Sequence, residues 1–172
     1  PLTTRPEVQR TVTVNWIQQR REALELIYRV VAAGQCVCWI RNTVDEAREI
    51  FQQLRSDGRV PEQDIVLFHS RFAFADRIAI EDKTLSWFGN HAPATARKGK
   101  VLIATQVVEQ SLDLDFDWMI SDLAPVDLLI QRAGRLQRHI RDADGQRKPA
   151  LPDGRQHPIL HILAPEWQEQ AA

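Results

Sequence analysis

The apolar residues of the chain follow two spacings in turn, one typical of helices and one typical of strands. Apolar residues along one helical face, in segments that end near a glycine, predict amphipathic helices at 15–33, 43–57 and 74–88. Short, nearly continuous apolar runs predict buried strands at 36–41, 64–68, 100–105, 118–121 and 158–163. Pro125 opens a further helix between the last two strands, and the polar stretches 91–99 and 141–156 predict loops, the second of them flexible.

Strands that alternate with helices indicate a parallel α/β sheet with right-handed crossovers, and a length of 172 residues suits one core. The start of the chain is polar and extended, and Thr11–Val14 fits either a short strand or a connector to another domain. We therefore expect a connector at 1–14, one domain at 15–165 and a tail at 166–172. The chain does not begin with methionine, which suggests a piece of a longer polypeptide.

Composition narrows the choice of partners only slightly. The chain is 44% hydrophobic and 26% charged with a net charge of -1, which is ordinary for a globular domain and gives no overall footprint for nucleic acid. Any anion site must therefore be local. The sequence has no apolar run of membrane-spanning length and no secretory signal at its start, so we expect a cytoplasmic protein without a membrane partner.

The two cysteines, Cys36 and Cys38, lie in a strand-like run, in which residues two positions apart face the same side. Together with His157 and His161 they could form a zinc tetrad, but their spacing matches none of the usual structural zinc patterns. We therefore interpret them as buried, reduced, structural cysteines, and expect no metal site.

Arginine recurs at every third position in Q-R-A-G-R-L-Q-R, as Arg132, Arg135 and Arg138. On a helix, the three guanidinium groups would form a staggered row along one side. Each guanidinium offers a planar fork of donors that fits phosphate oxygens, so two of them could bind a terminal phosphate while the third holds a neighbouring acid. The alternative is a solvated helix face, on which this spacing is also common.

Polar residues follow three of the predicted strands: His69-Ser70-Arg71, Thr105-Gln106 and Asp122. Ligands of parallel α/β sheets bind at the carboxyl ends of the strands. We therefore expect these residues to form a phosphate site at one edge of the sheet, together with Gln110, Asp113 and the row of arginines.

Two of these stretches resemble helicase motifs. Residues 101–117, V-L-I-A-T-Q-V-V-E-Q-S-L-D-L-D-F-D, resemble motif V of superfamily 2 helicases, and residues 131–138 resemble their motif VI, at the expected separation. With F-H-S-R-F and A-D-R upstream, the pattern more narrowly resembles the helicase-nuclease that degrades DNA in type I CRISPR systems. The resemblance covers about 15–165 and implies a RecA-like three-layer α/β/α lobe with a mainly parallel sheet and motifs IV to VI.

The resemblance also implies roles for matching residues. Arg135 and Arg138 would reach the γ-phosphate of ATP, with Arg138 as the arginine finger that offsets charge developing on the transferred phosphoryl group. The implied nucleotide-binding residues are Gln131, Arg132 and Asp113, and the implied nucleic-acid-binding residues are Ser70, Arg71, Thr105 and Gln106. Gln110-Ser111 and Gln131 stand where many relatives carry Arg-Gly and His, so Gln110 receives no firm role.

Other helicase elements are absent from the sequence. Gly99-Lys100 lacks the context of a phosphate-binding loop, and there is no D-E-x-H or D-E-A-D box and no H-D pair of nuclease ligands. The chain therefore resembles the second lobe alone, with ATP and Mg²⁺ held mainly by a first lobe. The implied partners are that first lobe and a nuclease domain of the parent chain, single-stranded DNA and the CRISPR RNA-guided surveillance complex.

Three functions remain open at this point. The first is the lobe of the CRISPR helicase, an ATP-dependent single-stranded DNA translocase that unwinds and helps degrade target DNA. The second is a lobe of another superfamily 2 DNA or RNA helicase. The third is a non-catalytic RecA-like module that only binds partners. In every case we expect the isolated chain to hydrolyse no ATP by itself.

Overall fold

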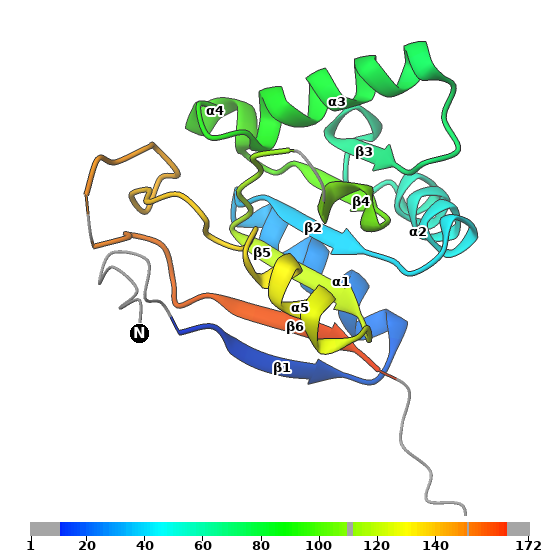
Figure 1. Ribbon diagram of the computed structural model, residues 1–172, viewed down its shortest axis with the longest axis horizontal. Helices are drawn as coiled ribbons and strands as arrows, with labels where there is room; N and C mark the ends of the chain where they lie inside the picture. Colours follow the sequence, from blue (N-terminus) through cyan, green and yellow to red (C-terminus); the bar gives the residue numbers. More distant parts are fainter. Residues whose placement is uncertain (1–10, 110–111, 151, 165–172) are drawn as a thin grey trace, which may run out of the picture.

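The computed structural model describes residues 11–109, 112–150 and 152–164 and contains a sheet of six strands. The strands are β1 (Thr13–Ile17), β2 (Val37–Ile40), β3 (Ile65–Phe68), β4 (Val101–Ala104), β5 (Trp118–Asp122) and β6 (Ile159–Leu163). Their order is β1-β6-β5-β2-β4-β3, and every neighbouring pair is parallel. The strands therefore present all their carboxyl ends at one edge (Figure 1).

Helices cover both faces of this sheet, as the predicted α/β/α fold requires (Figure 1). They are α1 (Arg20–Ala32), α2 (Val44–Asp57), α3 (Phe74–Phe88), α4 (Ala94–Arg97) and α5 (Val126–Ala133), with short 3-10 turns η2 (Glu62–Asp64) and η3 (Gln106–Glu109). Thr43 caps α2 by accepting a hydrogen bond from the Glu46 amide, and Gly58 ends α2 in the left-handed conformation that favours glycine. No helix in these described segments is long and apolar enough to cross a membrane.

Alternating strand residues divide the core into two layers. Val37 and Trp39 of β2 belong to the cluster under α1 and α2, whereas Cys38 and Ile40 belong to the cluster that includes residues of α3 and α5. Trp39 is 0% exposed and is the largest side chain of the core. This pattern confirms the mainly parallel three-layer fold.

The cysteines are buried, as predicted, and both are free thiols. Burial raises the pKa of each thiol far above its usual value. The zinc tetrad considered above does not form, because His161 stacks on Trp118, which packs against the core of the opposite sheet face.

The predicted helix at 15–33 is wrong in its first turn. Residues from Thr13 to Ile17 form strand β1, which pairs with β6, and the helix begins only at Arg20. Sheet pairing outweighs the helical spacing here, because Val12 and Ile17 pack against opposite core layers as alternating strand residues do. Of the stretch Thr11–Val14, for which a short strand was one alternative, Thr13 and Val14 lie in β1. The predicted loop at 91–99 contains the additional short helix α4.

Candidate functional site

The polar residues that directly follow the predicted strands lie at the carboxyl edge, but they differ in accessibility. Ser70 and Arg71 follow β3 and are exposed, and Arg71 Nη1 lies 3.2 Å from Asp45 Oδ1. Gln106 is exposed at the start of η3. Thr105 is only 1% exposed, and its amide donates a hydrogen bond to the Phe68 carbonyl. Of the predicted strand-end residues, the accessible ones are therefore Ser70, Arg71 and Gln106.

Asp122 ties the loop after β5 to the loop after β2. Its carboxylate accepts hydrogen bonds from Arg41 Nε at 2.9 Å and from the Asn42 amide at 3.0 Å, and the residue is 7% exposed. These contacts give Asp122 a structural role at the edge. Gln110 lies outside the described residues.

The expectation of one helical row of arginines is wrong, because α5 ends at Ala133. After Gly134 the chain runs beside the segment that precedes β5: Phe116 donates its amide hydrogen to the Arg135 carbonyl at 3.0 Å, and its own carbonyl accepts from the Gln137 amide at 2.7 Å. This bridge between Phe116 and Leu136 replaces the next helical turn. Arg135 and Arg138 therefore lie beyond the helix.

Arg132 is enclosed within the lobe. Its side chain is 2% exposed, and it donates hydrogen bonds to Glu109 at 2.6 Å and to the Ser121 hydroxyl at 2.8 Å. The guanidinium thus joins α5 to η3 and β5 instead of facing solvent. Its neighbour Gln131 is exposed.

Arg135 and Arg138 have different surroundings. Arg135 is half-buried and donates hydrogen bonds to the carbonyls of Leu112 and Glu109, while burial and the nearby charge of Arg138 lower the pKa of its guanidinium. Arg138 has a side chain that is 44% exposed, and its Nε lies 2.8 Å from Asp113 Oδ1. Of these two arginines, Arg138 is the one at the surface.

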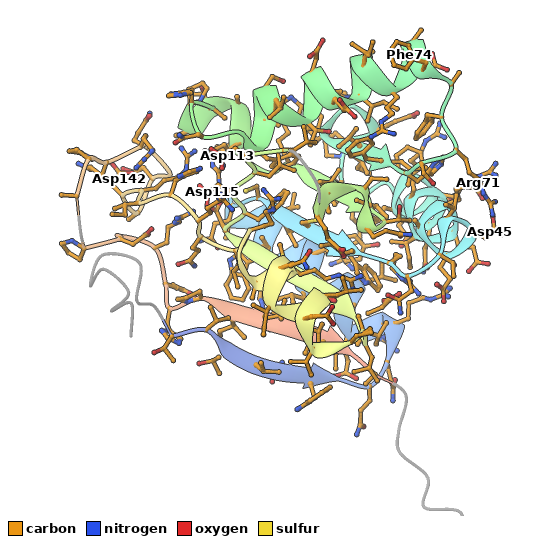
Figure 2. All side chains as sticks on the ribbon, in the orientation of Figure 1. Asp45, Arg71, Phe74, Asp113, Asp115 and Asp142 are labelled. Carbon is orange, nitrogen blue, oxygen red and sulfur yellow. The ribbon has the colours of Figure 1, made fainter. Side chains whose placement is uncertain are left out.

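The structure places these two groups of residues on separate surfaces. Arg71 and Asp45 lie together at the carboxyl edge, whereas Asp113 lies apart from them, beside Asp115 (Figure 2). Asp113 accepts from both Arg138 and His139 Nε2, the latter at 2.9 Å, and the pKa of His139 is lowered by burial despite this carboxylate. The sequence analysis was therefore wrong to gather Asp113 and Arg138 with the strand-end residues at one edge.

A buried ionic cluster underlies Asp113 and was missed by the sequence analysis. Asp115 and Arg141 are both 0% exposed, and Arg141 Nε lies 2.6 Å from Asp115 Oδ2. Arg155 Nη1 lies 3.1 Å from Asp115 and also 3.1 Å from Asp117. The only sequence signal for this cluster was the alternation of acids in D-L-D-F-D, which gives no indication of the distant arginines.

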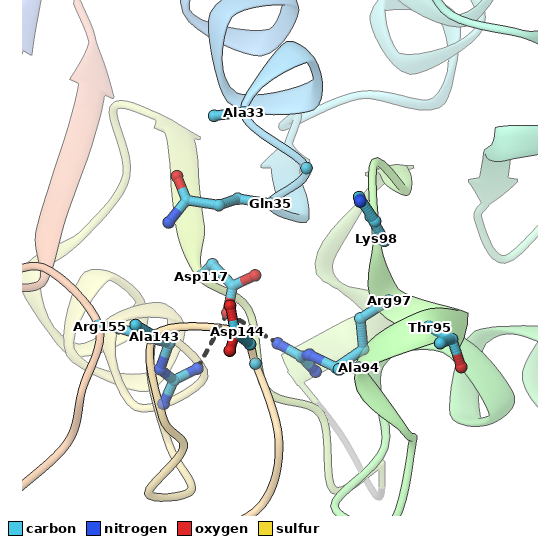
Figure 3. A pocket seen from close by; sticks show the side chains of 12 residues that line it. Ala33, Gln35, Ala94, Thr95, Arg97, Lys98, Asp117, Ala143, Asp144 and Arg155 are labelled. Carbon is cyan, nitrogen blue, oxygen red and sulfur yellow. Dashed lines mark hydrogen bonds and ion pairs between the residues drawn. The ribbon is translucent and has the colours of Figure 1, made fainter.

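The same cluster borders a cavity of about 300 Å³ on the side of the sheet where the strands begin. Figure 3 shows Arg97 and Arg155 on either side of Asp117, with Arg97 Nη2 3.0 Å from the carboxylate. Burial alone would raise the pKa of Asp117, but the two arginines and the Cys36 amide outweigh it, so the pKa lies below its usual value. The predicted loop at 141–156 is consequently anchored through Arg141 and Arg155.

A fully parallel α/β/α sheet whose last helix leads into an arginine segment defines the class of protein, a RecA-like helicase lobe. The family model described as the C-terminal part of the CRISPR-associated nuclease/helicase Cas3 matches residues 33–141. The chain belongs to the Cas3 family and is its second RecA-like lobe.

Individual relatives agree with this assignment. The chain is 43% identical over 148 residues to the CRISPR-associated endonuclease/helicase Cas3 of Escherichia coli K12, covering 84% of this chain and 16% of that protein. A crystal structure of T. fusca Cas3 is similar with a TM-score of 0.82 and 37% identity, over 99% of this chain and 20% of that one. A CRISPR RNA-guided surveillance complex in a pre-nicking state contains a similar chain, with a TM-score of 0.73 and 36% identity, over 94% of this chain and 20% of that one. The chain thus spans about a fifth or less of the length of these proteins.

Proposed function

We propose that this chain is the C-terminal lobe of an ATP-dependent single-stranded DNA translocase that unwinds and helps degrade target DNA in type I CRISPR interference. The observation that carries the proposal is the separation of two polar surfaces. One surface holds Arg138 and Asp113, and the other holds Ser70 and Arg71 at the carboxyl edge. Arg135 connects them, because it bonds to the end of η3, the turn that Gln106 begins. A translocase needs such a division, because nucleotide turnover at one surface must change the hold on DNA at another.

Arg138 is suited to be the arginine finger. Its ion pair with Asp113 joins two side chains that are each nearly half exposed, so solvent screens the pair and a phosphate can replace the carboxylate at small cost. Arg135 stands behind it with a guanidinium already fixed by two carbonyls. The two donors fit a terminal phosphate, with Arg138 as the group whose contact changes during hydrolysis.

ATP and Mg²⁺ would be held mainly by the first lobe of the parent protein. T. fusca Cas3, to which this chain is similar, has been crystallised with ATP, ADP and AMPPNP. Among the described residues no group of three or more acidic, histidine or cysteine side chains could hold a metal ion. Gln131 is exposed on α5 and could reach the nucleotide or the first lobe, whereas the enclosed Arg132 would support the site from within.

DNA would bind along the carboxyl edge. Ser70, Arg71 and Gln106 offer donors for the sugar-phosphate backbone, and Thr105 would order the turn beneath them through its backbone bond to β3. Such contacts carry no base information, so binding should be indifferent to sequence and sensitive to salt. The parent nuclease domain and the RNA-guided surveillance complex are the remaining proposed partners, the latter supported by the similar chain in the pre-nicking complex.

The decisive experiment is DNA-stimulated ATP hydrolysis by the parent protein with Arg138→Ala. We expect turnover to fall by about three powers of ten while ATP still binds, on the scale of other arginine fingers. Arg59→Ala is the matched control, because Arg59 is 51% exposed and pairs with Glu25 of α1, which covers the sheet face opposite α5. Unchanged turnover in Arg138→Ala would refute the proposal. The purified chain alone should hydrolyse no ATP, and measurable turnover would contradict the one-lobe account.

The alternatives make different predictions in the same assay. Another superfamily 2 helicase would also lose turnover with Arg138→Ala, but it would lack stimulation of DNA degradation by the surveillance complex. A non-catalytic module would show no dependence of parent turnover on Arg138. The match to the Cas3 family favours the lobe of a CRISPR helicase over both alternatives.

A further inference from the structure

The backbone between the two proposed catalytic arginines has an unusual conformation. Gln137 has a φ of 48°, and it is the one non-glycine residue with positive φ in the described part of the chain. Residues with a Cβ atom rarely adopt this left-handed conformation, and such residues collect at functional sites when the surrounding structure enforces them. Because Gln137 directly precedes Arg138, its backbone angle sets the direction in which Arg138 leaves the chain.

Contacts on both sides of Gln137 enforce the turn. Its amide donates a hydrogen bond to the Phe116 carbonyl at 2.7 Å, and its side-chain Nε2 donates to the Gln156 carbonyl at 2.8 Å. The Arg135 carbonyl accepts from the Phe116 amide, so the chain is held both before and at the turn. The turn is therefore fixed to the segment before β5 and to the end of the 141–156 loop.

Arg155 fixes the chain on the other side of Arg138. Its Nη2 donates a hydrogen bond to the His139 carbonyl at 2.5 Å, and its Nη1 pairs with Asp115 and Asp117. The Arg155 side chain is 2% exposed. A third carboxylate, Asp153, lies 2.7 Å from Nη2 and completes the set of partners. A guanidinium with this many fixed partners is a rigid support for the carbonyl that it holds.

We propose that Gln137 and Arg155 are positioning residues that together orient Arg138 for phosphoryl transfer. The inference rests on the proposed role of Arg138 and deepens it. Arg155 lies outside the 33–141 segment that matches the family model, and its pairing with Asp115 and Asp117 makes the far end of the 141–156 loop part of the nucleotide site. The Arg138 side chain is long and exposed, so contacts of the side chain alone do not fix its direction. Its preorganisation must come from the backbone on either side.

The test compares substitutions at Gln137 in the parent protein. Valine is β-branched and disfavours the left-handed conformation more strongly than glutamine does. We expect this preference to leave about a tenth of the molecules with Arg138 in place. We therefore expect Gln137→Val to lower kcat for DNA-stimulated ATP hydrolysis about tenfold, with the KM for ATP changed less than about twofold because the first lobe supplies most of the affinity. Gln137→Asn keeps an amide and tolerates positive φ, so it should retain most of the turnover.

Two further variants make the outcome specific. Gln146→Val introduces the same residue into the following 141–156 loop, at an exposed position without positive φ, and it should leave kcat unchanged. Arg155→Lys keeps the charge but cannot hold the His139 carbonyl and the carboxylates together, so it should lower kcat with the same small change in KM. If Arg155→Lys does not fold, the Gln137 series still decides.

The failure of this inference can be distinguished from failure of the proposed function. Wild-type kcat in Gln137→Val, with turnover lost in Arg138→Ala, would overturn the positioning role and leave the arginine finger standing. Wild-type turnover in Arg138→Ala would overturn both. A tenfold fall in kcat for Gln137→Val, rescued in Gln137→Asn and absent from Gln146→Val, is the expected result.

Discussion

Asp113 and Asp115 stand two residues apart, yet one carboxylate is 47% exposed and the other is 0% exposed. Asp113 pairs with the exposed Arg138, and Asp115 pairs with the buried Arg141 and Arg155. The short segment before β5 therefore carries two kinds of ion pair: a weak, exchangeable pair at Asp113 and a rigid, buried pair at Asp115. This contrast separates the part of the site that can respond to nucleotide from the part that supports it.

The exposed pair should contribute little to stability. We expect Asp113→Asn to change the free energy of unfolding by less than about 1 kcal/mol, because solvent screens the charges of an exposed pair. The same substitution should lower ATP turnover of the parent protein by less than Arg138→Ala does, since Arg138 loses a partner but keeps its charge. Urea denaturation and steady-state kinetics would measure the two effects. A large loss of stability would mean that Asp113 belongs to the buried cluster.

The buried pair should behave in the opposite way. Asp115→Asn removes the charge that balances two enclosed guanidinium groups, and the expected loss is about 3–5 kcal/mol of unfolding free energy. Asp113→Asn is the matched control for this variant. Urea denaturation of the two variants side by side gives the difference directly, and equal midpoints would contradict the assignment of Asp115 to a structural cluster.

His161 should make stability fall in mild acid. Burial and the charge of Arg29 lower its pKa to about 4, while Asn15 bonds to its Nδ1 atom at 3.0 Å. Because the pKa in the folded state lies below that of the unfolded chain, the stabilising contribution is complete above about pH 6.5 and is lost as the pH falls toward 4. The loss should reach about 3 kcal/mol near pH 4.

The comparison of wild type with His161→Phe isolates this effect. Phenylalanine retains a ring against Trp118 and does not titrate, so its loss of the Asn15 bond is the same at every pH. Carboxylates with lowered pKa values, such as Asp117 and Asp153, titrate in both proteins. Their contributions to the unfolding free energy therefore cancel when the two proteins are compared. Parallel curves of unfolding free energy against pH for the two proteins would rule out a depressed pKa at His161.

The layers of the fold could be predicted because local patterns determine them. The continuous apolar run at 100–105 matched β4, and the cap at Thr43 and the glycine at Gly58 marked the ends of α2. Where local and long-range signals disagreed, the sequence misled. Residues 15–17 match the apolar spacing of a helix, but they belong to a strand that pairs with β6. The regular spacing of the arginines suggested a continuous helix, although α5 ends before Gly134.

The supporting part of the site could not be predicted for a physical reason. Arg155 looked like a solvated residue of a polar loop, because nothing near it in the sequence requires burial. Its partners Asp115 and Asp117 lie about forty positions earlier, and only the folded chain brings the charges together. Ion pairs of high sequence separation leave no periodic pattern, whereas motif V and motif VI were visible because their residues are neighbours in the chain.

The last prediction concerns DNA at the carboxyl edge. Arg71 pairs only with the exposed Asp45 among the ion pairs of the described residues, so its guanidinium is available to a phosphate. If Arg71 neutralises one DNA phosphate, Arg71→Ala in the parent protein should reduce the slope of log affinity against log salt by about 0.7 for single-stranded DNA. Affinities for poly-dT and for a mixed sequence should fall by the same factor, because a backbone contact carries no base information. Arg59→Ala, at an exposed residue that precedes β3 and pairs with Glu25 of α1, is the control and should leave the slope unchanged. A wild-type slope in Arg71→Ala would move the DNA path away from β3, whereas a weakening confined to one sequence would mean that Arg71 reads a base.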